Sequence, residues 1–195
     1  MMMQKILGIV GWKNSGKTTL VESLLKEMAN RGLSISTIKH AHHNFDIDVP
    51  GKDSYRHRQA GAGEVLVVSA QRWALMHELP AERELSLSRL VARLAPCDLI
   101  LAEGFKKGPH PKIEVARFER EEGLIADQDA NVIAVATDNP LLAGHHRCLP
   151  LNEVAAIADF VCSYFELATS NTHLRSSHNS GRCNSTPCDQ YRRQN

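Results

Sequence analysis

The sequence lacks the features that mark several large classes of protein. Its formal net charge is only +1, so no overall field predicts binding to nucleic acid or to a membrane surface. No apolar run approaches the roughly 20 residues of a membrane span, and the apolar N-terminal stretch is too short for a signal peptide. The five cysteines are odd in number and, in the body of the chain, lack metal-site spacing. We therefore expect a cytoplasmic protein that binds neither nucleic acid nor membrane.

The residue pattern divides the chain after residue 166. Residues 1–166 carry short apolar runs that alternate with amphipathic stretches, which predicts a mostly parallel α/β sheet covered on both faces. Residues 167–195 are rich in Ser, Asn, Thr and Arg and have few apolar residues, so we expect a disordered tail. The tail contains histidines and cysteines whose spacing matches no standard zinc finger, namely His173, His178, Cys183 and Cys188.

Hydrophobic periodicity places the individual elements along residues 1–166. Apolar runs predict buried strands at 6–10, 33–38, 98–102 and 132–137, and an alternating run predicts a strand at 112–118. The helical period predicts helices at 18–31, 52–60, 85–94 and 154–165. Two further strands, at 64–69 and 72–77, are joined by a turn, which predicts an antiparallel hairpin at one edge of the sheet.

A phosphate-binding loop follows the first predicted strand. Residues 11–18, GWKNSGKT, match G-x-x-x-x-G-K-[ST] at every fixed position. The glycines let the backbone N–H groups face an anion, and the following helix adds its dipole. Lys17 is expected to reach the β- and γ-phosphates, and Thr18 to bind Mg²⁺. The expected fold is therefore P-loop NTPase-like.

A P-loop needs a carboxylate near its metal ion, and CDLILAEGF (97–105) offers one at each end of a strand. Ligands lie beyond the carboxyl ends of parallel strands, which favours Glu103 over Asp98. Glu103 would hold a metal-bound water or orient the attacking one, or it makes a structural contact to the next loop. Asp98 is expected to be a capping or surface residue.

The segment KHAHHNFDID (39–48) follows the second strand, so it emerges on the same side. Three interpretations remain open for it. Asp46 or Asp48 could approach Mg²⁺ as part of a switch-like loop; histidines and Asp46 could bind Zn or Ni; or the loop is simply polar and solvated. Lys39 could instead contact a phosphate.

Asp138 lies at the end of a late strand, in IAVATDNP, where a carboxylate could accept hydrogen bonds from guanine. The usual Asn-Lys-x-Asp sequence is absent, and Asp138 before Asn139 is equally a turn former. No arginine or glutamine is evident beside the phosphate loop, and without such a group P-loop hydrolysis is slow. Trp73, on a predicted edge strand, belongs to the core or to an interface, and pairing of edge strands across a two-fold would make a dimer.

The segments GWKNSGKTTL, TIKHAHHNFDIDVPGKDSYR, SAQRWALM, CDLILAEGFK and IAVATDNP together resemble the MobB family of molybdopterin-guanine dinucleotide biosynthesis adapter proteins. The resemblance runs from about residue 5 to about residue 165, and the tail has no counterpart. It implies a homodimeric GTP-binding protein that hydrolyses GTP weakly at most and associates with the guanylyltransferase that joins GMP to molybdopterin; the phosphate-loop motif itself adds Mg²⁺ as the expected cofactor.

By this resemblance the GTP phosphates would contact Gly11, Asn14, Ser15, Gly16, Lys17, Thr18 and Thr19. Glu103 matches the family's acidic strand end, and the residues themselves indicate a Mg²⁺ site made of Thr18, Glu103 and Asp46. Two alternatives stay open at this point. A small-molecule kinase would grip ATP in the loop and bind an acceptor through Lys39, Arg56 or Arg58. A metal-delivery GTPase would use His40, His42 and His43.

Overall fold

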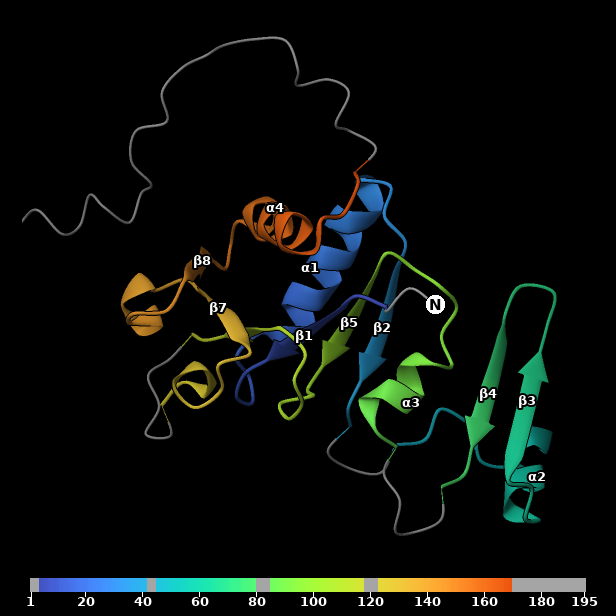
Figure 1. Ribbon diagram of the computed structural model, residues 1–195. Coiled ribbons are helices and arrows are strands. Elements are labelled where there is room, and N and C mark those ends of the chain that lie inside the picture. The colour runs from blue at the N-terminus through green and yellow to red at the C-terminus, as the bar shows by residue number, and fades with distance from the viewer. Residues whose placement is uncertain (1–3, 42–44, 80–84, 118–122, 170–195) are drawn as a thin grey trace, which may run out of the picture.

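The computed structural model describes residues 4–41, 45–79, 85–117 and 123–169. Their strands are β1 (Ile6–Val10), β2 (Ile35–Lys39), β3 (Glu64–Val68), β4 (Trp73–His77), β5 (Leu99–Glu103), β6 (Lys112–Val115), β7 (Val132–Thr137) and β8 (Cys148–Pro150). The helices and 3₁₀ turns are α1 (Lys17–Asn30), α2 (Asp53–Gln59), α3 (Leu87–Val91), η1 (Ile125–Asp127), η2 (Pro140–Ala143) and α4 (Val154–Phe165). Six strands form one parallel sheet in the order β2-β5-β1-β6-β7-β8, as Figure 1 shows. The expected α/β fold is confirmed.

Two helices cover one face of this sheet. Leu7 and Ile9 of β1 are fully buried there, where they belong to the same core as Leu24 of α1 and Ile157 of α4. Burial of each such side chain contributes about 1.5–3 kcal/mol. On the other face Val10 packs with residues of β7, η1 and η2. Both faces are therefore covered, but in the described chain the second face lies under 3₁₀ turns and loops rather than under long helices.

The hairpin β3–β4 is confirmed as an antiparallel pair, but it forms a two-stranded sheet of its own. It does not extend an edge of the six-stranded sheet, and α2 packs against β3. Figure 1 shows this pair and α2 standing beyond the β2 edge. In the described residues, no helix is both long and apolar enough to cross a membrane.

Two elements are shorter than the sequence predicts. The helix expected at 85–94 is helical only over α3. After Val91 the N–H groups of Arg93 and Leu94 donate to residues three positions back, at 3.0 and 3.1 Å, so the chain continues as turns. The strand expected at 112–118 ends at Val115, and residue 118 lies outside the described residues. The predicted tail, 170–195, also lies outside them.

Gly8, in the middle of β1, has no room for a larger side chain. A Cβ at this position would lie 2.8 Å from His110 Nε2 and 2.9 Å from Lys112 Cγ. Overpacking a close-packed interior costs about 1–3 kcal/mol, so we expect Gly8→Ala to lower the free energy of unfolding by that amount in urea denaturation. Gly63→Ala, where no atom lies within 4 Å of the new Cβ, is the control. Equal losses in both variants would contradict the packing argument.

Candidate functional site

The phosphate loop connects β1 to α1. A Cβ on Gly11 would lie 2.5 Å from the carbonyl oxygen of Val115, so only glycine fits between β1 and β6 here. Asn14 and Gly16 have φ angles of 64° and 95°, and these left-handed conformations produce the tight turn. Within the described chain no side chain caps α1 at Gly16. The first N–H groups of the helix are therefore available to an anion.

Polar side chains of the loop lie close to its backbone. Lys17 Nζ donates to the carbonyl oxygen of Trp12 at 2.7 Å, so the ammonium group folds back over the loop. Ser15 is 4% exposed, and its buried Oγ has no hydrogen-bond partner among the described residues. Thr19 is exposed in the first turn of α1. The loop thus combines the N-terminal end of α1, an ammonium group and a buried hydroxyl without a partner among the described residues, an arrangement that suits a bound phosphate.

Glu103 reaches the phosphate loop from the end of β5. Because β5 pairs in parallel with β1, the two strands end at the same edge of the sheet. Thr18 Oγ1 donates to Glu103 Oε1 at 2.8 Å, and Lys39 Nζ, at the end of β2, lies 3.6 Å from the same oxygen. The structure therefore brings together the hydroxyl and the carboxylate that the sequence predicts around a metal ion.

Asp98 lies at the opposite end of β5, on the surface. Its carboxylate accepts hydrogen bonds from the backbone N–H and the hydroxyl of Ser34, both at 2.7 Å. These bonds lower the pKa of Asp98, the backbone N–H having the larger effect. Asp98 fastens the start of β5 beside the start of β2, which is a structural role.

The His/Asp loop begins against Glu103 but then turns away. The backbone N–H of His40 donates to the carbonyl oxygen of Glu103 at 2.9 Å. The carboxylate of Asp46 accepts from the backbone N–H of Asp48 at 2.9 Å and from Arg58 of α2 at 2.7 Å, and these bonds lower its pKa. In the part of the chain that the structure describes, no hydrogen bond or ion pair joins Asp46 to Thr18 or Glu103. The loop's own metal site stays a prediction, since His42 and His43 lie outside the described residues.

Asp138 lies at the same edge of the sheet, directly after β7, and its nearest charged neighbour was not foreseen. Arg117 Nε is 4.0 Å from Asp138 Oδ2 and would lie 3.3 Å from a Cβ on Gly16. This Nε atom is buried and has no hydrogen-bond partner among the described residues. An arginine therefore lies against the phosphate loop, contrary to the sequence-based expectation. The position of Arg117 just after a predicted parallel strand could have indicated this, because the carboxyl ends of parallel strands lie at the same edge of a sheet.

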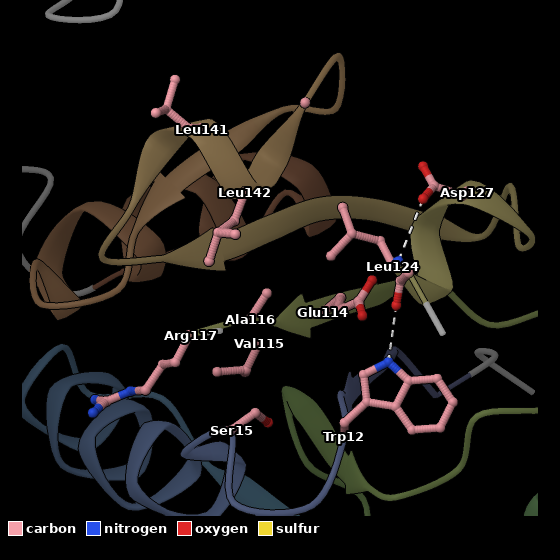
Figure 2. Close-up of a pocket in the computed structure, with 12 residues that line it drawn as sticks. Trp12, Ser15, Glu114, Val115, Ala116, Arg117, Leu124, Asp127, Leu141 and Leu142 are labelled. Carbon is pink, nitrogen blue, oxygen red and sulfur yellow. Dashed lines mark hydrogen bonds between the residues drawn. The ribbon is translucent and has the colours of Figure 1, made fainter. Parts of the chain in front are cut away.

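A pocket of about 350 Å³ lies beside the phosphate loop, between β6, η1 and η2 (Figure 2). Trp12 forms one wall, and its Nε1 donates to the carbonyl oxygen of Gly123 at 3.0 Å. Glu114 of β6 is fully buried, and its carboxylate accepts from the N–H groups of Ile125 and Ala126 at 3.0 and 2.9 Å. Burial raises the pKa of Glu114. The volume is that of a small-molecule pocket, which sequence reasoning missed because distant segments build it.

The model of the family Molybdopterin guanine dinucleotide synthesis protein B (MobB) matches residues 6–138. The chain belongs to the MobB family. The match spans the phosphate loop, Glu103 and Asp138, so the residues that the structure places at one edge of the sheet fall within the family's shared region.

Relatives and solved structures of the MobB family agree with this assignment. Two relatives carry the name molybdopterin-guanine dinucleotide biosynthesis adapter protein. The one from Escherichia coli K12 is 44% identical to this chain over 169 residues, which cover 84% of this chain and 95% of the relative. The one from Haemophilus influenzae is 42% identical over 158 residues, which cover 80% of this chain and 86% of the relative. A crystal structure of molybdopterin-guanine biosynthesis protein B superposes with a TM-score of 0.65 at 27% identity, covering 83% of this chain and 99% of that one. Bacillus subtilis MobB gives 0.63 at 29% identity, with coverages of 82% and 96%.

Proposed function

We propose that this protein is a GTP-binding adapter in the biosynthesis of molybdopterin guanine dinucleotide and acts in the cytoplasm. Its partner would be the guanylyltransferase that joins GMP to molybdopterin. The observation that carries the proposal is the convergence of the phosphate loop, Thr18 and Glu103 at one edge of the sheet of a MobB-family chain. The names of the E. coli and H. influenzae relatives support the same role.

The residues at this edge fit a magnesium nucleotide. The loop N–H groups and Lys17 would hold the phosphates, and Thr18 and Glu103 supply the oxygen ligands that Mg²⁺ prefers. Mg²⁺ would neutralise charge on the β- and γ-phosphates. Asp138 would accept hydrogen bonds from guanine. Asp46 is a weaker candidate ligand, because its carboxylate already pairs with Arg58.

We also propose that GTP hydrolysis is slow. Arg117 lies against Gly16 and near Asp138, on the side where the base is expected rather than beside Glu103. An arginine accelerates P-loop hydrolysis by stabilising charge on the transferring phosphoryl group, whereas the contacts of Arg117 are with Gly16 and Asp138 and not with Glu103. The protein would then act mainly by binding.

Affinity capture from a cell extract, with the full chain as bait and with or without GTP, tests the adapter role. Recovery of the guanylyltransferase is the expected result. Preference for ATP with phosphoryl transfer to a small acceptor would support the small-molecule kinase instead. Stoichiometric Zn or Ni binding that is lost when His40, His42 and His43 are all replaced by Ala would support the metal-delivery GTPase.

Glu103→Gln tests the proposed magnesium site. The amide keeps a hydrogen-bond acceptor for Thr18 but removes the negative charge. Loss of an outer-shell partner typically costs 10–100-fold in metal affinity, and loss of a direct ligand should cost no less, so we expect at least about 10-fold more Mg²⁺ to be needed for half-maximal GTP binding. Glu22→Gln, on the exposed side of α1, is the control. An unchanged Mg²⁺ requirement in Glu103→Gln would remove Glu103 from the site.

We propose that the hairpin joins two copies of the chain. On one of its faces Leu66, Val68, Trp73 and Leu75 are between 42% and 71% exposed, and such apolar patches mark interaction sites. Sedimentation should show a dimer at micromolar concentration for the native chain and a monomer for Leu66→Lys/Trp73→Lys. Leu141→Lys, at a residue 87% exposed elsewhere, should leave the dimer intact. A native chain that sediments as a strict monomer would refute this proposal.

A further inference from the structure

Potential metal ligands meet on the β7–β8 side of the sheet, whereas the His/Asp loop follows β2 at the opposite edge of the strand order. Asp127 comes from η1, and His145 and His146 come from the turn between η2 and β8. One ligand atom from each of these residues lies within 4.8 Å of the other two. His146 Nε2 is 2.8 Å from Asp127 Oδ1, and the two imidazole rings lie 4.0 Å apart between their centres.

The backbone on both sides of this cluster is held in place. Asp127 Oδ2 accepts from the N–H of Leu124 at 3.3 Å, and the two residues before Asp127 donate to Glu114. The N–H of His146 donates to the carbonyl oxygen of Ala143 at 2.9 Å. The His146 side chain is 16% exposed and that of Asp127 is 49% exposed. The cluster is thus fixed at its base and accessible to solvent on one side.

The chemistry of the three groups selects a class of ion. Two imidazoles and one carboxylate suit Zn²⁺ and its neighbours Ni²⁺ and Cu²⁺, whereas Mg²⁺ and Ca²⁺ prefer oxygen ligands alone. A hydrogen bond between Asp127 and His146 needs no second histidine, yet His145 brings its imidazole to the same point. We propose that Asp127, His145 and His146 form a binding site for a divalent transition-metal ion. With three protein ligands, a tetrahedral ion keeps one position for another ligand.

The site borders the pocket beside the phosphate loop. Asp127 lines that pocket, and so does Gly144, the residue before His145. The two histidines lie beyond the region that the family model matches, which ends at residue 138. The ion would therefore add a positive charge and an open coordination position at the rim of the pocket. This inference does not depend on GTP binding or on the adapter role.

Calorimetric titration of the metal-free, reduced full chain with Zn²⁺ tests the site. Asp127→Asn keeps one acceptor oxygen for the N–H of Leu124, and its NH2 group can donate to Nε2 of His146 in the tautomer that accepts there, so it should fold normally. His145→Ala removes a second ligand independently. Relative to the native chain we expect each variant to lose one equivalent of bound Zn²⁺ or to weaken it by at least the 10–100-fold typical of an outer-shell change. His77→Ala, on the hairpin and bonded to Glu64, is the matched control.

Counting equivalents separates this site from other histidines and from the cysteines. Zn²⁺ bound by the 39–48 loop or by residues 167–195 would remain in both variants, and Co²⁺ held by cysteine would show sulfur charge-transfer absorption. The native chain should bind one equivalent of Co²⁺ that shows no sulfur charge-transfer absorption. Asp127→Asn should fail to bind this equivalent. Identical Zn²⁺ stoichiometry and affinity in the native chain, Asp127→Asn and His145→Ala would overturn the proposal. So would an equal loss in His77→Ala.

Discussion

Lys17→Ala is expected to weaken GTP binding by about 30-fold to several-thousand-fold while the fold is retained. Truncating one partner of a hydrogen-bonded charge pair costs about 2–5 kcal/mol, and each 1.4 kcal/mol is a factor of ten in affinity. The ammonium group of Lys17 is aimed at the loop itself, where its Nζ donates to the carbonyl oxygen of Trp12. Its removal takes a positive charge from the phosphate site but removes little packing from the core, because Lys17 is not among the buried residues of α1. Titration with a fluorescent GTP analogue measures the loss.

The matched control is Lys26→Ala, which removes the same charge from an exposed position of the same helix. Its GTP affinity should stay close to that of the native chain. Equal unfolding midpoints of the two variants and the native chain would show that the fold is intact. Unchanged GTP affinity in Lys17→Ala would refute the assignment of residues 11–18 as a phosphate site.

Lys112→Ala is expected to lower the free energy of unfolding by about 3–5 kcal/mol, the usual cost of breaking a buried ion pair from one side. Lys112 is fully buried at the start of β6. Its Nζ pairs with Asp129 Oδ2 at 2.9 Å and donates to the carbonyl oxygens of Gly108 and His110 at 2.6 and 3.1 Å. Its removal leaves a half-buried carboxylate and two carbonyl groups without this donor. Urea denaturation followed by circular dichroism measures the change.

Two further variants identify the cause. Lys107→Ala, at an exposed lysine of the same segment, should change stability by less than about 0.5 kcal/mol, as surface substitutions usually do. Lys112→Met combined with Asp129→Asn should be more stable than Lys112→Ala, because it fills the space and leaves no unpaired charge. A loss below about 1 kcal/mol in Lys112→Ala would contradict the role assigned to this lysine.

The periodic parts of the fold could be predicted from the sequence because each carries its own local signal. The apolar run of β1, the phosphate loop and the helical period of α1 are adjacent in the chain, so local spacing was enough to place them. Glu103 could be paired with Thr18 because parallel strands end at one edge of a sheet, and the structure has that contact at 2.8 Å.

The parts that could not be predicted depend on contacts between distant segments. Lys112 and Glu114 alternate with apolar residues, a pattern that usually indicates a half-exposed strand, yet both are fully buried. Their partners come from residues 108–110 and 125–129, and no local pattern announces such pairs. Arg117 follows a predicted parallel strand, which places it at the correct edge, but only the sheet order shows that β6 lies beside β1 and the phosphate loop.

The hairpin also bears on how the protein can vary. β2 and β5 are neighbours in the parallel sheet, and a parallel crossover needs only a dozen or more residues. In this chain residues 40–98 connect β2 to β5. Much of this long connection forms α2 and the β3–β4 pair, which is hydrogen-bonded to none of the other described strands. We therefore expect insertions or deletions within α2 and the β3–β4 pair to leave the register of the six parallel strands unchanged. The topology thus makes the hairpin a separate module, which can change in length or shape while the edge that carries the phosphate loop is preserved.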